Sequence, residues 1–383
     1  MRPPFFVKPF NVMSVQTDCL DNIIGLSRTA CDCFEVPTNT SDSGLYLDEV
    51  EGLNLVQINA AADCGNGSVW QMLERARRNA IGQFKTDLSS RLMLAYKPSR
   101  SAFKGIIGRS EYKHNVSQIS NIAGIQMLCA PVKNGSIILT RIGLLMASSG
   151  TVDVAIYSNI DDEPVVAFDG LNASANKVSW NNIEKTVLPM YTTEADYLIY
   201  YIIYSYTGNV PKDNQLQCFS CSGKQIVNYH HTDPVFGKAI NDARYTWYQW
   251  VNATGITGAD IDTVKSANAG FKNLAYGLLL DGEVKCNASD IACNDVDYTN
   301  SPVALVNAYS VRWKAAELVC EAILRSTQIN LYTMMDLDSV RNMRNKCRTE
   351  YSNRLDWLVE NMDWAGTGCF TCDPKLRKGS LLR

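Results

Sequence analysis

The chain of 383 residues lacks several features that would place it in a common functional class. No apolar run reaches the ~18 residues needed to span a bilayer, which argues against membrane insertion. Only three histidines occur, and no G-x-S-x-G elbow, P-loop, H-E-x-x-H or G-x-G-x-x-G pattern is present. The net charge of −3 is small, which argues against a dedicated binder of nucleic acid. We therefore expect no enzymatic activity, no specific nucleic acid and no membrane insertion.

The first ten residues also lack the apolar stretch of a secretory signal. Pro3, Pro4 and Pro9 break any helix there. We therefore expect the chain to begin at Met1, to be made in a cytoplasm and not to be secreted.

Apolar residues make up 46% of the chain, which is enough to build one or more ordinary cores. Strand-length segments rich in β-branched and aromatic residues occupy 137–145, 151–157, 183–190 and 197–204. The dipeptides 134–135 and 169–170 and the tripeptide 148–150 are predicted to be turns between them. These features predict a central antiparallel β-sandwich that is jelly-roll-like.

Helices are predicted on both sides of this block. Ser68 and Gln71 have capping-box spacing. The apolar stripe that follows is Val69, Leu73, Ala76, Ala80, Phe84, Leu88 and Leu92, with Arg75, Arg78, Lys85 and Asp87 on the opposite, solvated face. Near the C-terminus, Ser301 followed by Pro302 predicts a helix start, and two stripes predict an αα-hairpin. The stripes are Val306, Tyr309, Trp313, Ala316, Cys320 and Ile323, then Val340, Met343, Cys347, Tyr351, Leu355, Leu358 and Met362.

The sequence thus predicts an α+β multidomain protein whose β-sandwich is flanked by an N-terminal extended arm plus helix and by a C-terminal αα-hairpin. An arm of this kind must lie on its own or a neighbour's surface. The aromatic run 243–250 is expected to be buried either within one chain or at a boundary between subunits, and the sequence leaves both possibilities open. The predicted regions are an extended arm (1–67), a helix and linker (68–119), the β-sandwich (120–217), a mixed aromatic-rich region (218–300), and a helical hairpin with a CxxC tail (301–383).

Cysteine, by contrast, is plentiful, with 13 in the chain. Cys129, Cys320 and Cys347 stand alone on apolar faces and are predicted to be small core residues. Other cysteines are spaced like ligands, namely Cys31/Cys33, Cys218/Cys221, Cys286/Cys293 and Cys369/Cys372.

Three interpretations of these spaced cysteines stay open. Cys218, Cys221, Cys369 and Cys372 have the C-x2-C spacing that suits a structural zinc site, which is the one cofactor we consider. The second is a dithiol–disulfide enzyme, although neither pair opens a helix after a strand. The third, which we favour, is free thiols or thiols that are oxidised late into disulfides.

Three further groups are weak candidates for binding. His230 and His231 with Asp233 are candidate metal ligands without a third helical or strand partner. Asp161, Asp162 and Glu163 resemble calcium ligands in a turn, without the EF-hand pattern. The aromatic residues Tyr157, Trp180 and Tyr191 would suit a sugar-stacking platform on the sandwich, although such residues more often belong to a core.

The order of elements resembles virion structural proteins (neck, tail or baseplate) of tailed bacteriophages that infect Bacteroides-type hosts, crAss-like phages included. The elements are Cys31-x-Cys33, the segment 44–53, a helix, the sandwich ending in Cys218-Phe-Ser-Cys221, a hairpin containing 314–324, and Cys369-Phe-Thr-Cys372. The resemblance implies a homo-oligomeric ring or adaptor that contacts other neck or tail proteins, assembled in the host cytoplasm and located in the virion. The alternative is a receptor- or carbohydrate-binding tail component that uses the sandwich.

Overall fold

The computed structural model describes twelve stretches of the chain: 19–28, 39–53, 55–62, 67–99, 102–117, 120–206, 208–216, 247, 250–266, 273–286, 288–326 and 336–374. These residues divide into two compact units. The helical unit takes its described residues from Met1–Tyr96, Ala288–Asp363 and Pro374–Arg383, and the sandwich unit from Lys97–Asn287 and Trp364–Asp373. Each unit is therefore assembled from segments that are far apart in the sequence.

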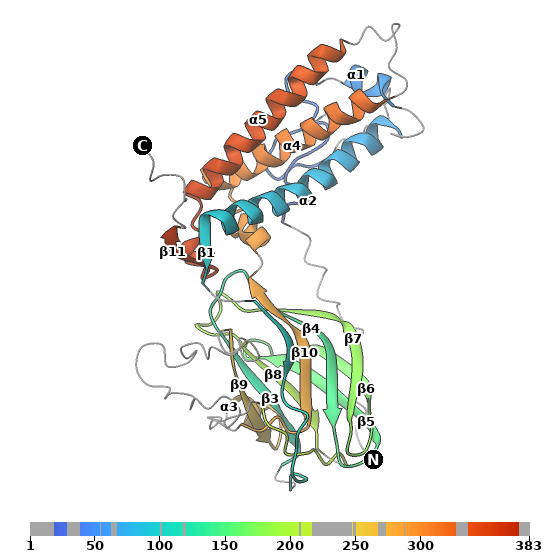
Figure 1. The fold of residues 1–383 in the computed structure, drawn as a ribbon, viewed down its shortest axis with the longest axis vertical. Helices are drawn as coiled ribbons and strands as arrows, with labels where there is room; N and C mark the ends of the chain where they lie inside the picture. The colour runs from blue at the N-terminus through green and yellow to red at the C-terminus, as the bar shows by residue number, and fades with distance from the viewer. Residues whose placement is uncertain are drawn as a thin grey trace. The chain divides into compact units, whose positions relative to one another are not determined.

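The helical unit contains three long helices that lie side by side (Figure 1). They are α2 (Val69–Ala95), α4 (Pro302–Arg325) and α5 (Leu337–Asn361), with the short α1 (Leu55–Ala60) and the 3-10 turn η3 (Ala288–Asn294) beside them. Helix α2 begins at the Ser68 capping box that the sequence predicts, and every residue of its predicted apolar stripe is buried. Asp87 is half-buried rather than fully solvated as predicted, because it accepts a hydrogen bond of 2.8 Å from the Tyr351 hydroxyl on α5.

Helices α4 and α5 form the predicted αα-hairpin. Ser301 caps α4, and its hydroxyl accepts from the amide of Ala304. The helices are antiparallel, since Tyr309 lies near Arg354 while the later residue Glu317 contacts the earlier Arg348.

The buried face of α4 is wider than the predicted stripe. Its predicted members Val306, Tyr309 and Trp313 are half-buried, whereas Asn307, Ser310 and Glu317 are buried. The reason is that α4 packs against both α2 and α5, so that one apolar stripe cannot cover both contacts.

The described part of the N-terminal region folds against its own unit. Leu20, Ile23, Ile24, Leu26 and Leu47 are each 0% exposed. Residues 19–28 and 39–53 are joined by the Gly25–Tyr46 bridge and by the Asn39 side chain, which accepts from the amide of Leu26 at 2.7 Å. The apolar side chains of these two stretches are therefore buried against the chain itself, and a neighbouring subunit is not needed to bury them.

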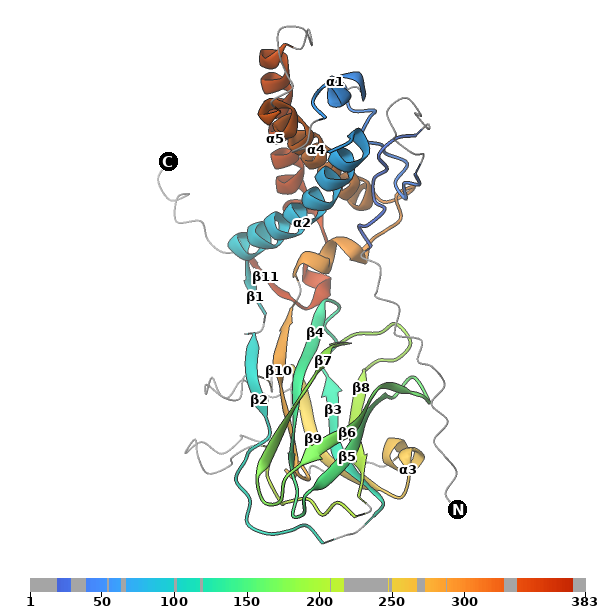
Figure 2. The ribbon, with the colours of Figure 1, turned by 90° about the vertical axis from the view of Figure 1, so that its right-hand side faces the viewer.

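The sandwich unit contains two antiparallel sheets, whose strands are labelled in Figure 2. The four-stranded sheet has the order β2 (Phe103–Ile107), β10 (Leu278–Cys286), β4 (Gly135–Leu145) and β7 (Val178–Pro189). The five-stranded sheet has the order β6 (Pro164–Ala173), β5 (Gly150–Ser158), β8 (Ile199–Ser205), β3 (Ile122–Cys129) and β9 (Val251–Gly258). Two strands of a further small sheet, β1 (Tyr96–Pro98) and β11 (Phe370–Pro374), pair with each other. The α+β fold with a β-sandwich is as predicted, and the sheets also include β2, β9 and β10 from outside residues 120–217.

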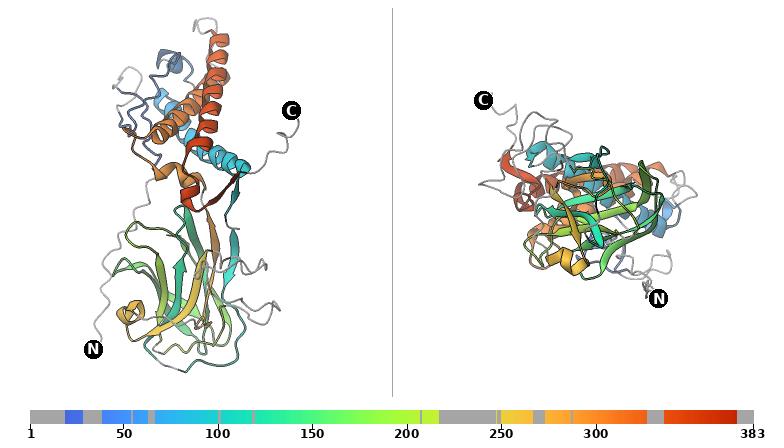
Figure 3. Two further views of the ribbon diagram at one scale, coloured as in Figure 1. Left: turned by 90° about the vertical axis from the view of Figure 1, so that its left-hand side faces the viewer. Right: turned by 90° about the horizontal axis from the view of Figure 1, so that it is seen from below.

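The sandwich core lies between the two sheets. Ile142, Leu144 and Leu280 from the four-stranded sheet and Ile125 and Ile202 from the five-stranded sheet are each 0% exposed. A second apolar cluster of Tyr201, Ile203, Ile256 and Val264 lies under the short helix α3 (Ile261–Ser266), which Figure 3 shows beside the sheet.

Two of the predicted turns have other roles. Asn134–Gly135 does not close a hairpin, because β3 pairs with β8 and β9 while β4 pairs with β10 and β7. Asp169–Gly170 lies inside β6, where the pairing with β5 shifts register between Val152 and Val154. Gly170 has φ +65°, and both a tight turn and a β-bulge use glycine in this conformation, so the dipeptide does not distinguish between them.

Within the aromatic run 243–250, the two described residues are Trp247 and Trp250, and each is 1% exposed. They are buried within this chain, and the amide of Ala130 donates to the Trp250 carbonyl at 2.8 Å. Among the described helices, none is long and apolar enough to cross a membrane.

Candidate functional site

The cysteines form the most distinctive chemical feature of both units. In the sandwich unit, Cys286 at the end of β10 is bonded to Cys369, which lies between the 3-10 turn η5 (Ala365–Thr367) and β11. The two residues are 83 positions apart, and their Cα atoms are 5.7 Å apart, as a disulfide requires. Cys369 is 2% exposed and Cys286 is half-buried.

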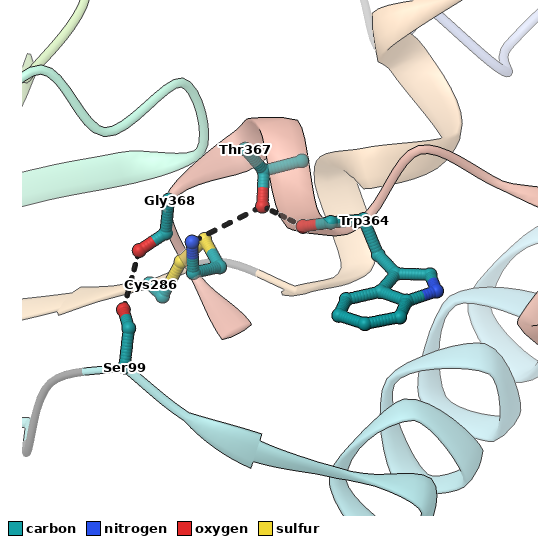
Figure 4. The surroundings of a disulfide bond; sticks show 6 residues. Ser99, Cys286, Trp364, Thr367 and Gly368 are labelled. Atoms are coloured by element: carbon teal, nitrogen blue, oxygen red, sulfur yellow. Dashed lines mark hydrogen bonds between the residues drawn. A yellow bond between two sulfur atoms is a disulfide. The ribbon is translucent and has the colours of Figure 1, made fainter. Parts of the chain in front are cut away.

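A network of hydrogen bonds holds the turn that carries Cys369 (Figure 4). The Thr367 hydroxyl donates to the Trp364 carbonyl at 2.6 Å and accepts from the Cys369 amide at 3.1 Å. The Ser99 hydroxyl donates to the Gly368 carbonyl, and the Ser99 amide donates to the Cys369 carbonyl at 2.9 Å. Gly368 has φ +71°, which allows the chain to turn into the disulfide. This rigid, covered setting suits a structural bond.

A second disulfide joins Cys19 to Cys293 in the helical unit. It connects the N-terminal region to η3 across 274 positions of the sequence, again with a Cα–Cα distance of 5.7 Å. Both residues are half-buried. Each unit therefore has one described cross-link between segments that the sequence separates widely.

These partners differ from those that the spacing suggests. Cys286 and Cys293 are close in sequence but bond to different partners in different units. Cys369 is bonded to Cys286, so its sulfur is not free to ligate zinc. Cys218 and Cys221 lie outside the described residues, as do Cys31 and Cys33, and the side chain of Cys372 is not described either. Sequence spacing misled here because disulfide partners are chosen by proximity in space.

The described residues gather no group of three or more His, Cys, Asp or Glu side chains that would hold a metal ion. The acidic turn at 161–163 contacts a lysine instead. Lys265 Nζ donates to the Asp161 carbonyl at 2.6 Å and lies 3.6 Å from the Asp162 carboxylate. His230, His231 and Asp233 lie outside the described residues.

The three aromatic residues of the predicted sugar platform do not lie on one face. Tyr157 projects from β5 against the cluster under α3. Trp180 lies on β7 in the other sheet, and Tyr191 follows the end of that strand. The Arg141 guanidinium, which Asp281 holds at 2.7 Å, lies over the Trp180 ring at 4.9 Å. A sugar stacking on that ring face would have to displace the guanidinium.

Among the described cysteines of the helical unit, Cys320 on α4 and Cys347 on α5 are free. Both are 0% exposed, as is Cys129 of the sandwich, which is also outside any disulfide among the described residues. Their burial confirms the prediction of small core residues.

The same region contains a cavity of about 370 Å³. Residues from 51–53, α4 and the first part of α5 line it, among them Glu51, Cys320, Met343 and Lys346. The Lys346 ammonium lies 3.0 Å from the Glu51 carboxylate.

A buried carboxylate lies one helical turn from Cys320. The side chain of Glu317 is 2% exposed and contacts Lys314 at 2.9 Å and Arg348 at 2.8 Å. The two basic groups compensate the buried charge. Alternation and stripe analysis missed Glu317 because charged residues are normally predicted to face solvent.

The chain was compared with protein-family models, with curated proteins and with solved structures. None of the three comparisons finds a match.

Proposed function

We propose that this chain is a structural subunit of a tailed-phage virion, in the neck, tail or baseplate, and that it acts through contacts between subunits. The proposal rests on the resemblance in element order described above. The observation that carries it furthest is the presence of one described long-range disulfide in each unit, Cys19–Cys293 and Cys286–Cys369.

Long-range disulfides suit a protein that must persist outside the cell. Disulfides form and endure in oxidising surroundings, including the surfaces of virions, and are rare in a bacterial cytoplasm. A subunit that is assembled in the reducing host cytoplasm and oxidised after lysis would acquire both bonds on release. The buried position of Cys369 and the hydrogen bonds that hold its turn support a bracing role over disulfide exchange at that bond.

The further parts of the proposal are a jelly-roll-like connection of the strands, a closed ring of identical subunits and contacts with other neck or tail proteins. A closed ring requires heterologous contacts that repeat around an axis. The alternative, a receptor- or carbohydrate-binding component, has less support because Tyr157, Trp180 and Tyr191 do not share a face.

The test begins with the full chain purified without reductant and measured by size-exclusion chromatography with light scattering. The expected result is a mass that is a multiple of 42.5 kDa and corresponds to a closed ring. A monomer at the highest attainable concentration contradicts intrinsic ring formation.

Cryo-electron microscopy of particles that contain the chain then decides its place. Copies that repeat around the particle axis support the structural role. A single copy at a tail tip, with binding to a glycan array, contradicts it and favours the receptor-binding alternative.

A further inference from the structure

One face of the α4–α5 hairpin gathers two cations and two aromatic rings. Arg312 and Trp313 follow Tyr309 on α4 by three and four positions, so the three side chains share one face of the helix, and each is half-buried. The Arg312 guanidinium lies over the Tyr309 ring at 4.9 Å and over the Trp313 ring at 6.0 Å. The Arg354 guanidinium of α5 lies over the same Tyr309 ring at 5.1 Å. We call these four residues the arginine–aromatic cluster.

The arginine–aromatic cluster has more donors than acceptors. The Arg312 guanidinium makes no hydrogen bond and no ion pair with the described residues. Its Nε atom is buried, and so are the Trp313 Nε1 and the Arg354 Nε, each without an acceptor in the part of the chain that the structure describes. Because buried polar groups in folded proteins nearly always have a partner, three orphaned donors at one place call for an explanation.

The charges of the cluster are unbalanced as well. Arg354 pairs with Glu350 at 3.1 Å, whereas Arg312 has no carboxylate within ion-pair distance among the described residues. The Glu49 carboxylate favours the charged form of Arg312 from a greater distance, but it is already paired with Arg28 at 2.6 Å. Since a half-buried cation is less well hydrated than an exposed one, a counter-ion at Arg312 would be bound more strongly than at an exposed arginine.

The cluster is open to a ligand at the ends of its arginines. The Arg354 side chain is 28% exposed, and Arg312 is half-buried. Because both Nε atoms are buried, the terminal Nη groups are the donors that remain for a ligand. A carboxylate suits them, since its two oxygens can accept from two guanidinium N–H groups at once.

The composition of the cluster favours a carboxylate that belongs to a protein. Tyrosine, tryptophan and arginine are the residues most enriched at the centres of protein–protein interfaces. The rings of Tyr309 and Trp313 offer apolar surface to the methylene groups of an acidic side chain, which a free phosphate lacks. The Glu350 carboxylate beside Arg354 repels a polyanion such as nucleic acid, yet it leaves one positive charge for a single carboxylate to balance.

We propose that the arginine–aromatic cluster binds the carboxylate of one glutamate or aspartate side chain from a neighbouring protein subunit. The Nη groups of Arg312 hold the carboxylate, and the rings of Tyr309 and Trp313 pack against the methylene groups next to it. This inference rests on the proposed function, which it deepens by naming one contact between subunits and the chemistry of the partner.

The test uses the full chain with isotopic labels, and NMR follows the Trp313 Nε1–H and Arg312 Nε–H signals. The probe is a capped tripeptide with a central glutamate, and the same peptide with glutamine is its uncharged control. We expect both signals to shift until they saturate with the glutamate peptide and to stay unchanged with the glutamine peptide. Arg312→Gln should weaken binding, measured at Trp313, by on the order of tenfold or more.

Arg325→Gln is the matched control, because Arg325 lies on the same helix but its side chain is 80% exposed. This substitution should leave binding unchanged, and hydrogen exchange in α4 and α5 checks that both variants fold. The proposal is overturned if the two substitutions weaken binding equally, if the glutamine peptide binds as well as the glutamate peptide, or if inorganic phosphate binds more tightly than either peptide.

Light scattering separates this site from the proposed ring. The peptide titration is run at a dilution at which light scattering shows single chains, so that no neighbouring copy occupies the cluster. If a ring forms at higher concentration but single chains do not bind the glutamate peptide, the site is overturned and the proposed function stands. If single chains bind the glutamate peptide but no ring forms at any concentration, the site stands and the proposed ring fails.

Discussion

Both units bury polar side chains, but they bury them at different places in their elements. The sandwich buries aliphatic side chains such as Ile142, Leu144 and Leu280 between its sheets. The helical unit buries Asn307, Ser310 and Glu317 on a single helix, each 1% exposed or less. In the sandwich, the fully buried Asn214 lies between strands, and its amide donates to the Leu278 carbonyl at 3.1 Å. Helix α4 instead buries polar residues within a helix, because it packs against both α2 and α5.

Each buried polar residue of α4 has a hydrogen-bonding or oppositely charged partner that stabilises it. The Asn307 amide donates to the Ala292 carbonyl at 3.2 Å, and the Ser310 hydroxyl donates to the Val306 carbonyl at 2.7 Å. Glu317 has Lys314 and Arg348. The stability of the helical unit should therefore depend on these particular pairs as well as on packing.

Removing the disulfides should give the largest effects. We expect Cys19→Ala with Cys293→Ala, and Cys286→Ala with Cys369→Ala, each to lower the free energy of unfolding of its own unit by roughly 2–5 kcal/mol. The first pair closes the longer loop and should cost about 1 kcal/mol more, because loop entropy grows with the logarithm of length. Hydrogen exchange with mass spectrometry resolves the two units.

The control for the disulfides is Cys129→Ala, which removes a buried thiol without removing a cross-link. A phosphine reductant should destabilise the wild-type units but leave the matching alanine variants unchanged. Equal protection of each unit with and without its disulfide would contradict the bracing role.

Glu317→Ala tests whether the stability of the helical unit depends on its buried carboxylate. The substitution leaves Lys314, whose side chain is 14% exposed, without its acidic partner, and should cost roughly 3 kcal/mol in the helical unit alone. The matched control is Glu321→Ala on the same helix, because Glu321 is 24% exposed and its contacts with Arg348 and Arg325 are longer, 3.5 Å and 3.4 Å. Urea unfolding at pH 7 measures both, and equal losses would show that burial of Glu317 is unimportant.

Tyr351→Phe should have the smallest effect and one that depends on pH. Burial, together with donation to the Asp87 carboxylate, raises the pKa of the Tyr351 phenol above its ordinary value of about 10. The folded state therefore holds the proton more tightly, so this stabilisation is complete below about pH 10 and is lost as the pH rises above it. At pH 8 the variant should be less stable by roughly 1–2 kcal/mol.

Above pH 10 the difference between Tyr351→Phe and the wild type should shrink, because only the wild type loses this stabilisation. Tyr309→Phe is the control on the same hairpin, since the Tyr309 hydroxyl makes no hydrogen bond with the described residues. Urea unfolding at pH 8 and 10.5 provides the comparison. A difference that stays constant over this range would contradict the assignment.

The amino-acid sequence by itself determined those elements in which local pattern and burial agree. The α2 stripe, the Ser301 cap and the strand-length segment 151–157 were readable from local pattern. In the structure Val152, Val154 and Ile156 of that segment are buried, as the period of a strand requires. The free, buried state of Cys129, Cys320 and Cys347 followed from their apolar surroundings in the same way.

Tertiary structure alone decided the partners. Disulfide pairing depends on which Cα atoms come within bonding distance, so Cys286 bonds to Cys369 although Cys293 is nearer in sequence. The burial of Glu317 and the cavity beside Cys320 arise only when α4 meets α5 and residues 51–53. Local pattern reports which side of an element is apolar, but the identity of the groups across the interface is a property of the packed chain.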